Sequence, residues 1–362
     1  MSRRRSGTWL GFDPWLLSAV LLLAGLGLAI LYGASGGDRE LVLNQAARFG
    51  LGLVLMVVLS RIPTPWLMSW SPWLYLLALV LLVAVAVMGV GRGAHRWLDL
   101  GVVRFQPSEI AKLGLPMMLA WVLHTRPLPP SVGTLAWLAV LIMAPVLLIA
   151  EQPDLGTATL VACSGLFVVF LAGLSWRWIS GLGLLVATAV PVIWQLMHDY
   201  QRSRVHTFLD PGADPLGQGW NIIQSQIAVG SGGLTGKGYL HGTQSQLQFL
   251  PEHTTDFVFA VFAEEFGLIG VIVMLVLYAV IISRGLIIAA RARHTYGRLL
   301  AGAISLTVFV YVLVNGAMVA GLLPVVGMPM PLISYGGTSA VTLLAGFGLI
   351  MSVNRYRRGP GT

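Results

Sequence analysis

Ten long apolar runs make up most of the chain, and mostly short polar segments separate them. A run of roughly 20 apolar residues is long enough to cross the hydrocarbon core of a bilayer as a helix. The pattern therefore predicts an all-α, polytopic integral membrane protein of about ten transmembrane helices, forming a single domain over residues 1–362. The predicted spans are 14–32, 45–60, 72–90, 107–124, 132–150, 156–173, 176–197, 257–283, 299–323 and 337–353.

The composition excludes a soluble globular protein. Hydrophobic residues account for 56% of the chain and charged residues for only 10%, and no soluble globular protein of this size can bury so much apolar surface. In a soluble domain the net charge of +8 would suggest nucleic acid, but in a membrane protein it reflects topology first, so no nucleic-acid partner is expected. The single cysteine, Cys163, cannot form an intrachain disulfide.

The distribution of basic residues predicts the orientation. Thirteen of the 22 Lys and Arg residues fall at the termini or in loops on the same side of an even number of spans, which predicts that both termini are cytoplasmic. The first span follows three arginines, as in a signal peptide, but its length and the later spans favour an uncleaved helix. Most of the remaining basic residues gather in two outer loops, 91–106 and 198–255, which indicates that function lies there.

The first outer loop leads into a charged helix start. Arg104 precedes Pro107, and Glu109 and Lys112 follow at a spacing that places them on one helix face. The two charges form either a structural ion pair or part of an aqueous cavity, because charges within a span usually face a partner or water. The arginines of this loop suit lipid headgroups or the phosphates of a lipid-linked substrate equally well.

The second outer loop, 198–255 between the seventh and eighth spans, is too poor in aliphatic residues to form a domain of its own. Trp220, Ile223 and Ile227 stand at helical spacing and predict a short interfacial or re-entrant helix. Lys237 lies between two glycines but does not fit the phosphate-loop pattern. The histidines lack the spacing of a zinc site, so no metal ligands are predicted.

Asp256 stands where this polar segment ends and a strongly apolar run begins. A carboxylate at the water end of a membrane helix can have a raised pKa and still meet a soluble reactant. The alternative is a helix N-cap, a role open to Asp256 and to the threonines before it. Glu264 follows eight residues later, within about 80° around the helix axis and ~12 Å deeper, where it either lines the same cavity or braces another helix.

The region from Asn315 to Ser339 holds three prolines and the sequence Ser-Tyr-Gly-Gly-Thr-Ser at 334–339. Such an irregular segment is tolerated at membrane depth only where it lines a cavity or is packed in protein. This signature resembles that of the SEDS family (shape, elongation, division and sporulation). Three further stretches, at 93–112, 224–238 and 250–267, agree with the resemblance, which covers nearly the whole chain and is greatest to the members that serve elongation.

The resemblance implies a peptidoglycan glycosyltransferase of the bacterial cytoplasmic membrane. It would polymerise lipid II onto a growing polyprenyl-linked glycan strand, beside a class B penicillin-binding protein that crosslinks and among membrane lipids. Asp256 would be the general base, and Glu109, Glu264, Ser334 and Tyr335 would support the site. A divalent cation, Mg or Mn, at Asp256 stays open. The cations expected to bind diphosphate or sugar are Arg48, Arg104, Lys112, Arg202, Arg204 and Lys237.

Two other functions fit the same pattern. A lipid II flippase or secondary transporter would also have many spans and buried charges, but such proteins usually place their key charges at the midplane between internal repeats, and no convincing repeat is found. A scaffold that only recruits a crosslinking enzyme would not need a carboxylate and several cations on one outer loop. For the enzyme, we expect a groove open to lipid, bordered by the helix from Phe257 and the long loop.

Overall fold

The computed structural model describes residues 12–89, 96–99, 104–197, 199–213, 217–243 and 254–356. Within these ranges ten helices have 16 residues or more, and each coincides with an apolar run. Six of them, α1, α2, α3, α5, α11 and α12, are long and apolar enough to cross a membrane, while the count of ten spans stays a prediction. The ten are α1 (Pro14–Ala34), α2 (Arg39–Arg61), α3 (Thr64–Met88), α4 (Ser108–Leu123), α5 (Val132–Glu151), α6 (Leu155–Leu171), α7 (Trp176–Leu196), α11 (Val258–Ala290), α12 (Thr295–Val319) and α13 (Thr338–Arg355).

Polar residues between the apolar runs fix where several helices begin. Asp13 accepts a hydrogen bond from the backbone N–H of Leu16 at the start of α1, and Asp38 does the same for α2. Ser131 and Asp154 cap α5 and α6 in the same way. Each cap satisfies a backbone donor that the helix itself leaves unpaired, so the short polar segments stabilise the helices they connect.

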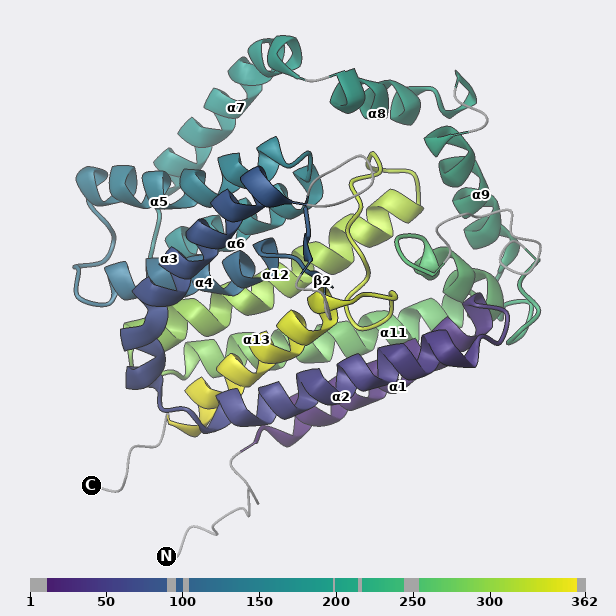
Figure 1. Ribbon diagram of the computed structural model, residues 1–362, viewed down its shortest axis with the longest axis horizontal. Coiled ribbons are helices and arrows are strands. Elements are labelled where there is room, and N and C mark those ends of the chain that lie inside the picture. Colours follow the sequence, from purple (N-terminus) through teal and green to yellow (C-terminus); the bar gives the residue numbers. More distant parts are fainter. Residues whose placement is uncertain are drawn as a thin grey trace, which may run out of the picture.

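The helices form one bundle in which α13 lies parallel to α2 (Figure 1). Glycines allow this close approach: a Cβ at Gly52 would lie 2.5 Å from a Leu344 methyl, and one at Gly348 would lie 2.7 Å from the Met56 carbonyl oxygen. On the other side of the bundle, α11 packs against α1 and α12, and α4 lies between α3, α6 and α12. Small residues at helix contacts are typical of membrane bundles.

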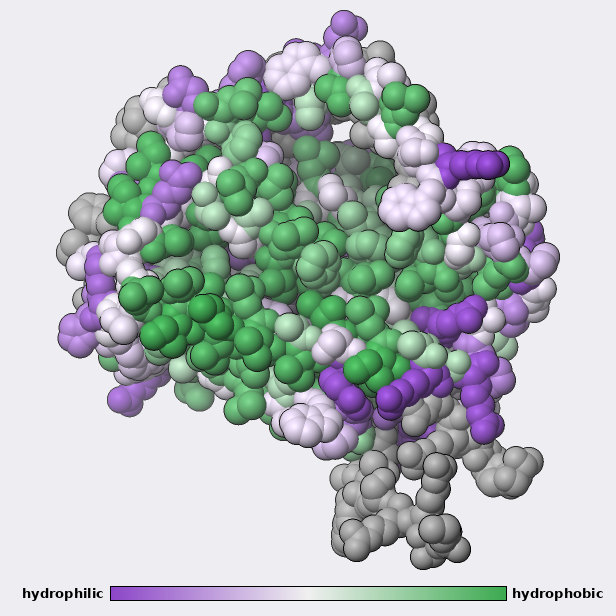
Figure 2. Space-filling model, turned by 180° about the vertical axis from the view of Figure 1, so that it is seen from behind, coloured by the Kyte–Doolittle hydropathy of each residue, from purple (hydrophilic) through white to green (hydrophobic). Residues whose placement is uncertain are grey.

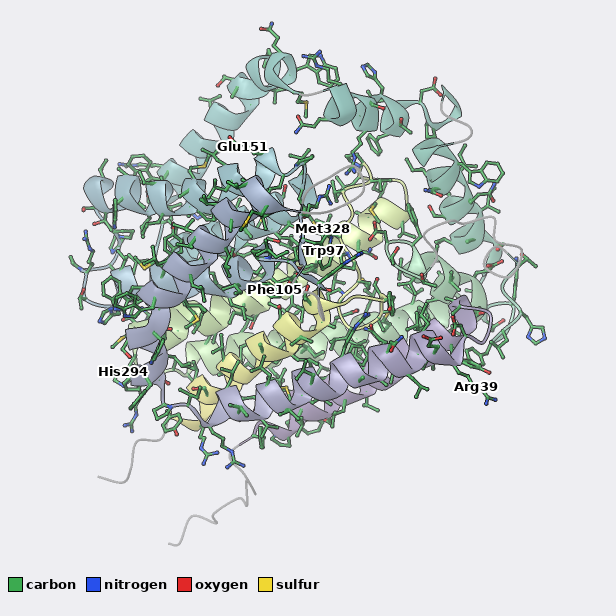
Figure 3. All side chains as sticks on the ribbon, viewed as in Figure 1. Arg39, Trp97, Phe105, Glu151, His294 and Met328 are labelled. Carbon is green, nitrogen blue, oxygen red and sulfur yellow. The ribbon has the colours of Figure 1, made fainter. Side chains whose placement is uncertain are left out.

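The two ends of the described chain lie at the same end of the bundle. The Arg61 guanidinium lies 5.9 Å from the Phe12 ring centroid, and the Tyr356 hydroxyl donates to the Arg61 carbonyl oxygen at 2.8 Å. Arg39 and His294 mark opposite ends of the molecule (Figure 3). This arrangement agrees with an even number of crossings, and the side that faces the cytoplasm stays a prediction.

Much of the bundle surface is apolar, and Figure 2 shows a broad hydrophobic face with polar residues toward its edges. Large side chains such as Val80, Ile272 and Leu313 are more than half exposed. Exposed apolar surface of this extent is unfavourable in water and is expected of helices that face lipid.

The segment between α7 and α11 contains helices of its own. The predicted short helix is confirmed as α9 (Gln218–Ser231), which packs against α11. Helix α8 (Asp199–Leu209) and the turn η1 (Pro211–Ala213) were not predicted, because α8 is polar and has no apolar periodicity. Helices α7 and α8 form an arch at the edge of the molecule (Figure 1). Residues 244–253 of the predicted loop lie outside the described residues.

Two short strands, β1 (Leu98–Asp99) and β2 (Arg104–Phe105), pair antiparallel in the first outer loop. Arg96 anchors this loop by donating to the carbonyl oxygen of Gln152, and Gln106 donates to an Asp154 carboxylate oxygen at 3.0 Å. The loop is therefore tied to the turn between α5 and α6, directly beside the start of α4.

Helix α11 is interrupted at Gly267, whose backbone (φ 63°, ψ −165°) is open to glycine but strained for other residues. The turn that follows α9 lies against this break. The backbone N–H groups of Lys237 and Gly238 donate to the carbonyl oxygens of Glu264 and Glu265, and Leu268 N–H donates to the Gly233 carbonyl oxygen, each at 3.0 Å. Part of the predicted outer loop thus folds back against the helix that follows Asp256.

Candidate active site

The segment 320–337, which joins α12 to α13, is irregular and packed in protein, as its prolines predicted. Arg204 of α8 donates to the Val325 carbonyl oxygen at 3.0 Å, and the buried Tyr278 hydroxyl of α11 donates to the Pro331 carbonyl oxygen. A Cβ at Gly156, at the start of α6, would lie 2.3 Å from the Val326 carbonyl oxygen. Backbone groups that no helix satisfies thus find partners on several surrounding helices.

Asp256 is held against this segment by Asn315 of α12. The fully buried Asn315 amide donates from Nδ2 to the Asp256 carbonyl oxygen at 2.9 Å and to the Met328 carbonyl oxygen at 2.7 Å. Met328 lies near the centre of the molecule (Figure 3). The Asp256 carboxylate faces Gly327, where an added Cβ would lie 3.6 Å from Oδ2.

The N-cap position of α11 is Phe257, one residue after Asp256, and the Phe257 side chain makes no capping hydrogen bond. Asp256 is half-buried and precedes the cap. The N-cap role that was the alternative for Asp256 therefore stays a prediction beside that of general base.

Arg48 and Tyr335 lie beside the same segment. The Tyr335 N–H donates to the Thr254 carbonyl oxygen at 2.8 Å, and the Arg48 guanidinium of α2 lies 4.7 Å from the Tyr335 ring centroid. The Ser334 hydroxyl accepts from the Met330 N–H at 2.7 Å, which fixes the turn before Tyr335. Tyr335 thus contacts Arg48 through its ring and bonds the backbone two residues before Asp256 through its N–H.

Glu109 and Lys112 form a buried ion pair within α4. Lys112 Nζ lies 2.8 Å from Glu109 Oε1 and 5.5 Å from the Tyr311 ring centroid. Tyr311 precedes Asn315 by one helical turn on the same face of α12. The ion pair predicted from the spacing of Glu109 and Lys112 is therefore present. It lies against Tyr311, one turn before the residue that holds Asp256.

Of three further predicted arginines, Arg104 lies on β2, and Arg202 and Arg204 both lie on α8. Arg104 is exposed on β2. Arg202 donates to the carbonyl oxygens of Trp194 and Gln195 near the end of α7, and Arg204 bonds the irregular segment. The bond from Arg204 thus joins α8 to the segment that holds Asp256.

Lys237 and Glu264 form a second ion pair, at 2.6 Å, away from Asp256. Glu264 is fully buried, and its Oε1 also accepts from the N–H and hydroxyl of Thr243 at 3.0 and 2.9 Å. Glu264 was predicted either to line the cavity of Asp256 or to brace another segment. These contacts support the second role. Partial burial, followed by the charge of Glu265, raises the pKa of the nearby Tyr239 phenol, which donates to the Ala29 carbonyl oxygen.

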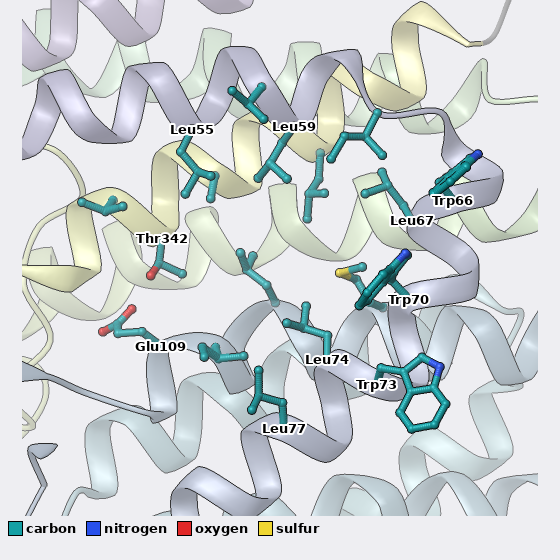
Figure 4. A pocket seen from close by; sticks show the side chains of 18 of the residues that line it. Leu55, Leu59, Trp66, Leu67, Trp70, Trp73, Leu74, Leu77, Glu109 and Thr342 are labelled. Atoms are coloured by element: carbon teal, nitrogen blue, oxygen red, sulfur yellow. The ribbon is translucent and has the colours of Figure 1, made fainter. Parts of the chain in front are cut away.

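A large apolar groove of about 1270 Å³ opens between α2, α3, α4 and α13 (Figure 4). Trp66, Trp70 and Trp73 of α3 line one end, and Glu109 and Thr342 lie at the other. The groove expected beside Phe257 and the long loop stays a prediction, and the groove seen here, on another face, was not expected. Hydropathy could not locate it, because a gap between two lipid-facing helices leaves no mark in either sequence.

No group of three or more His, Cys, Asp or Glu side chains suited to a metal ion occurs among the described residues. Asp256 is the only acidic side chain between 254 and 263. A divalent cation, Mg or Mn, at Asp256 stays a prediction.

Comparison with known proteins identifies the family. The model of the cell cycle protein family FtsW, RodA and SpoVE matches residues 14–359. The chain belongs to this family. Within the FtsW, RodA and SpoVE family, the chain is 54% identical over 348 residues to the peptidoglycan glycosyltransferase MrdB of Escherichia coli K12, covering 96% of this chain and 94% of the relative. It is 34% identical over 366 residues to stage V sporulation protein E of Bacillus subtilis, covering 96% and 98%.

Solved structures of family members share the fold. The rod shape determining protein RodA of Thermus thermophilus is 33% identical, with a TM-score of 0.75 over 98% of this chain and 100% of that one. A chain from a peptidoglycan synthase complex that coordinates polymerization and crosslinking is 38% identical, with a TM-score of 0.85 over 97% and 100%. The resemblance inferred from the four motifs is thereby confirmed.

Three residues that organise the site were given no role from the sequence: Gln45, Tyr311 and Asn315. Each is a polar or hydroxyl-bearing side chain within an otherwise apolar run. Polar groups inside a span usually have a partner or a function, and this was the available signal.

Proposed function

We propose that this chain is a peptidoglycan glycosyltransferase that polymerises lipid II into glycan strands at the outer face of the bacterial cytoplasmic membrane, in cell elongation and cell-shape control. The observation that carries the proposal is 54% identity over nearly the whole chain to a protein named peptidoglycan glycosyltransferase. The half-buried carboxylate of Asp256, held by Asn315 beside an irregular segment, supports it.

In this proposal Asp256 is the general base. It takes the proton of the 4-hydroxyl of an N-acetylglucosamine unit as that oxygen attacks the anomeric carbon of the donor. The bond from the anomeric carbon to the diphosphate oxygen breaks, and the polyprenyl diphosphate leaves with both electrons. The bonds from Asn315 to the backbone of Asp256 and Met328 keep the base in place through the reaction.

The leaving diphosphate requires positive charge. Arg48 of α2 stacks on Tyr335, and Lys112 of α4 lies against Tyr311, one turn before Asn315 on α12. These contacts support a role for both cations. Glu109 keeps Lys112 oriented. Arg104, Arg202, Arg204 and Lys237 remain predicted ligands, although Lys237 is already paired with Glu264.

The apolar groove suits a polyprenyl tail. Its walls come from α2, α3 and α13, and its lining is almost entirely aliphatic and aromatic. The end at Glu109 and Thr342 lies toward the charged site, so a lipid carrier in the groove would direct its headgroup toward the site. A class B penicillin-binding protein is the proposed crosslinking partner, since a structural relative comes from a peptidoglycan synthase complex.

The test is reconstitution. The purified protein, with a class B penicillin-binding protein, is given lipid II, and products are separated by size. We expect glycan strands that persist when the transpeptidase is blocked by a β-lactam. Transfer of lipid II across vesicle membranes without strand formation would contradict the proposal and support a flippase.

A further inference from the structure

The first turn of α13 begins beside open space. Its N-cap is Gly337, no side chain caps the turn, and a Cβ added at Gly337 would meet no atom within 4 Å. The first backbone N–H groups of a helix lack partners within the helix and carry a partial positive charge. This makes the start of an 18-residue helix a suitable place for an anion, provided that other groups point there.

Gln45 of α2 supplies the second, independent observation. Its side chain is 1% exposed, and its Oε1 accepts from the Gly336 N–H at 3.4 Å. Because that contact fixes the orientation of the amide, Nε2 is the remaining donor, and it has no partner among the described residues. A buried amide N–H without a partner is unfavourable, so an acceptor from outside the described residues is expected there.

Two more buried atoms beside the same turn lack partners in the described part of the chain. They are one terminal nitrogen of Arg48 and the hydroxyl of Thr338. Arg48 follows Gln45 by three residues on the same face of α2 and stacks on Tyr335. An amide N–H, a guanidinium and a hydroxyl, next to a helix start, together match a ligand that has several negatively charged oxygens.

The apolar groove indicates that the ligand also has an apolar tail. Thr342, at the charged end of the groove, donates from its hydroxyl to the Thr338 carbonyl oxygen at 3.0 Å, so the groove ends one helical turn from the start of α13. A molecule with its apolar tail in the groove would place its head at this turn. We propose that the first turn of α13, with Gln45, Arg48 and Thr338, binds a phosphate group of the polyprenyl diphosphate carrier, which rests on the proposed function.

Gln45→Glu tests this site directly. The substitution is nearly isosteric and keeps an oxygen for the Gly336 N–H, but it replaces the donor with a negatively charged acceptor. Binding of geranylgeranyl diphosphate to the purified full-length protein in detergent is measured by calorimetry, beside geranylgeraniol, which lacks the phosphates. We expect the dissociation constant of the diphosphate to rise by at least about 10-fold in the variant, as loss of a charge-assisted hydrogen bond predicts.

The control is Asn44→Asp, which adds the same charge on the exposed face of α2 and should leave binding unchanged. If Gln45→Glu lowers the melting temperature, diphosphate binding is measured instead with Thr338→Val, which removes only the hydroxyl group. Equal diphosphate affinity in wild type and in the stable Gln45 or Thr338 variants would overturn the site. Wild-type protein that forms strands from lipid II and yet fails this binding test would refute the site alone, whereas absent strand synthesis would refute the proposed function.

Discussion

At the scale of single residues, Lys112 and Glu109 combine a buried ion pair with a proposed role at the diphosphate. Their side chains are 9% and 4% exposed, so each depends on the other to be tolerated in the bundle. Lys112→Met would leave Glu109 buried without its partner, and we expect it to lower the free energy of unfolding by about 3–5 kcal/mol.

The double variant Lys112→Met with Glu109→Gln separates the two roles. It removes both charges, so thermal melts should recover most of the lost stability, while polymerisation from lipid II should stay low because no ammonium is present for the diphosphate. A double variant with wild-type activity would show that the pair is structural only.

The charged residues were visible in the sequence, and spacing predicted the pair Glu109–Lys112, but partners from distant segments were not predictable. The helical angle between Asp256 and Glu264 allowed them to share a cavity, yet Glu264 bonds Lys237 and Thr243. An angle around one helix does not say which segment packs there. Asn315 was equally hidden, because its function is to bond two backbone carbonyl oxygens that only the fold brings together.

At the scale of elements, hydropathy located the ten long helices but not all of their ends. The run predicted at 45–60 is a helix from Arg39, because Asp38 caps it and the helix extends through polar residues before the apolar run. The run predicted at 72–90 begins at Thr64, within a stretch whose Trp, Ser and Pro residues weaken the apolar signal. Helix α8 and the strands β1 and β2 could not be predicted, because none of them has a long enough periodic pattern of apolar residues.

The break in α11 gives a prediction at this scale. A Cβ on Gly267 would lie 2.3 Å from the Gly236 nitrogen, in a backbone conformation that favours glycine. We expect Gly267→Ala to lower the free energy of unfolding by more than about 1–3 kcal/mol, seen as a reduced melting temperature in detergent. Gly230→Ala in α9 is the matched control: a Cβ there meets nothing within 4 Å, so this variant should be at least as stable as wild type, and equal stability of the two alanine variants would contradict the account.

At the scale of the whole molecule, the groove links the lipid-facing surface to the site. Val341→Trp would fill the groove next to Thr342. We expect KM for lipid II with a long polyprenyl chain to rise about 10-fold, since apolar contacts are lost, while a short-chain analogue is used as before. Leu275→Trp, on the exposed face of α11, is the control. An equal effect of Val341→Trp on both substrates would exclude the groove as the tail site.

The base assignment has one decisive measurement, glycan synthesis from lipid II by the purified Asp256→Asn complex, beside a thermal melt. Asn is nearly isosteric and, like Asp, a good helix N-cap, so the melting temperature and partner binding should stay close to wild type. The amide cannot take the hydroxyl proton, so strand synthesis should fall by roughly 10²–10⁴-fold. Near-normal strand synthesis by the Asn variant would contradict the assignment of Asp256 as the general base.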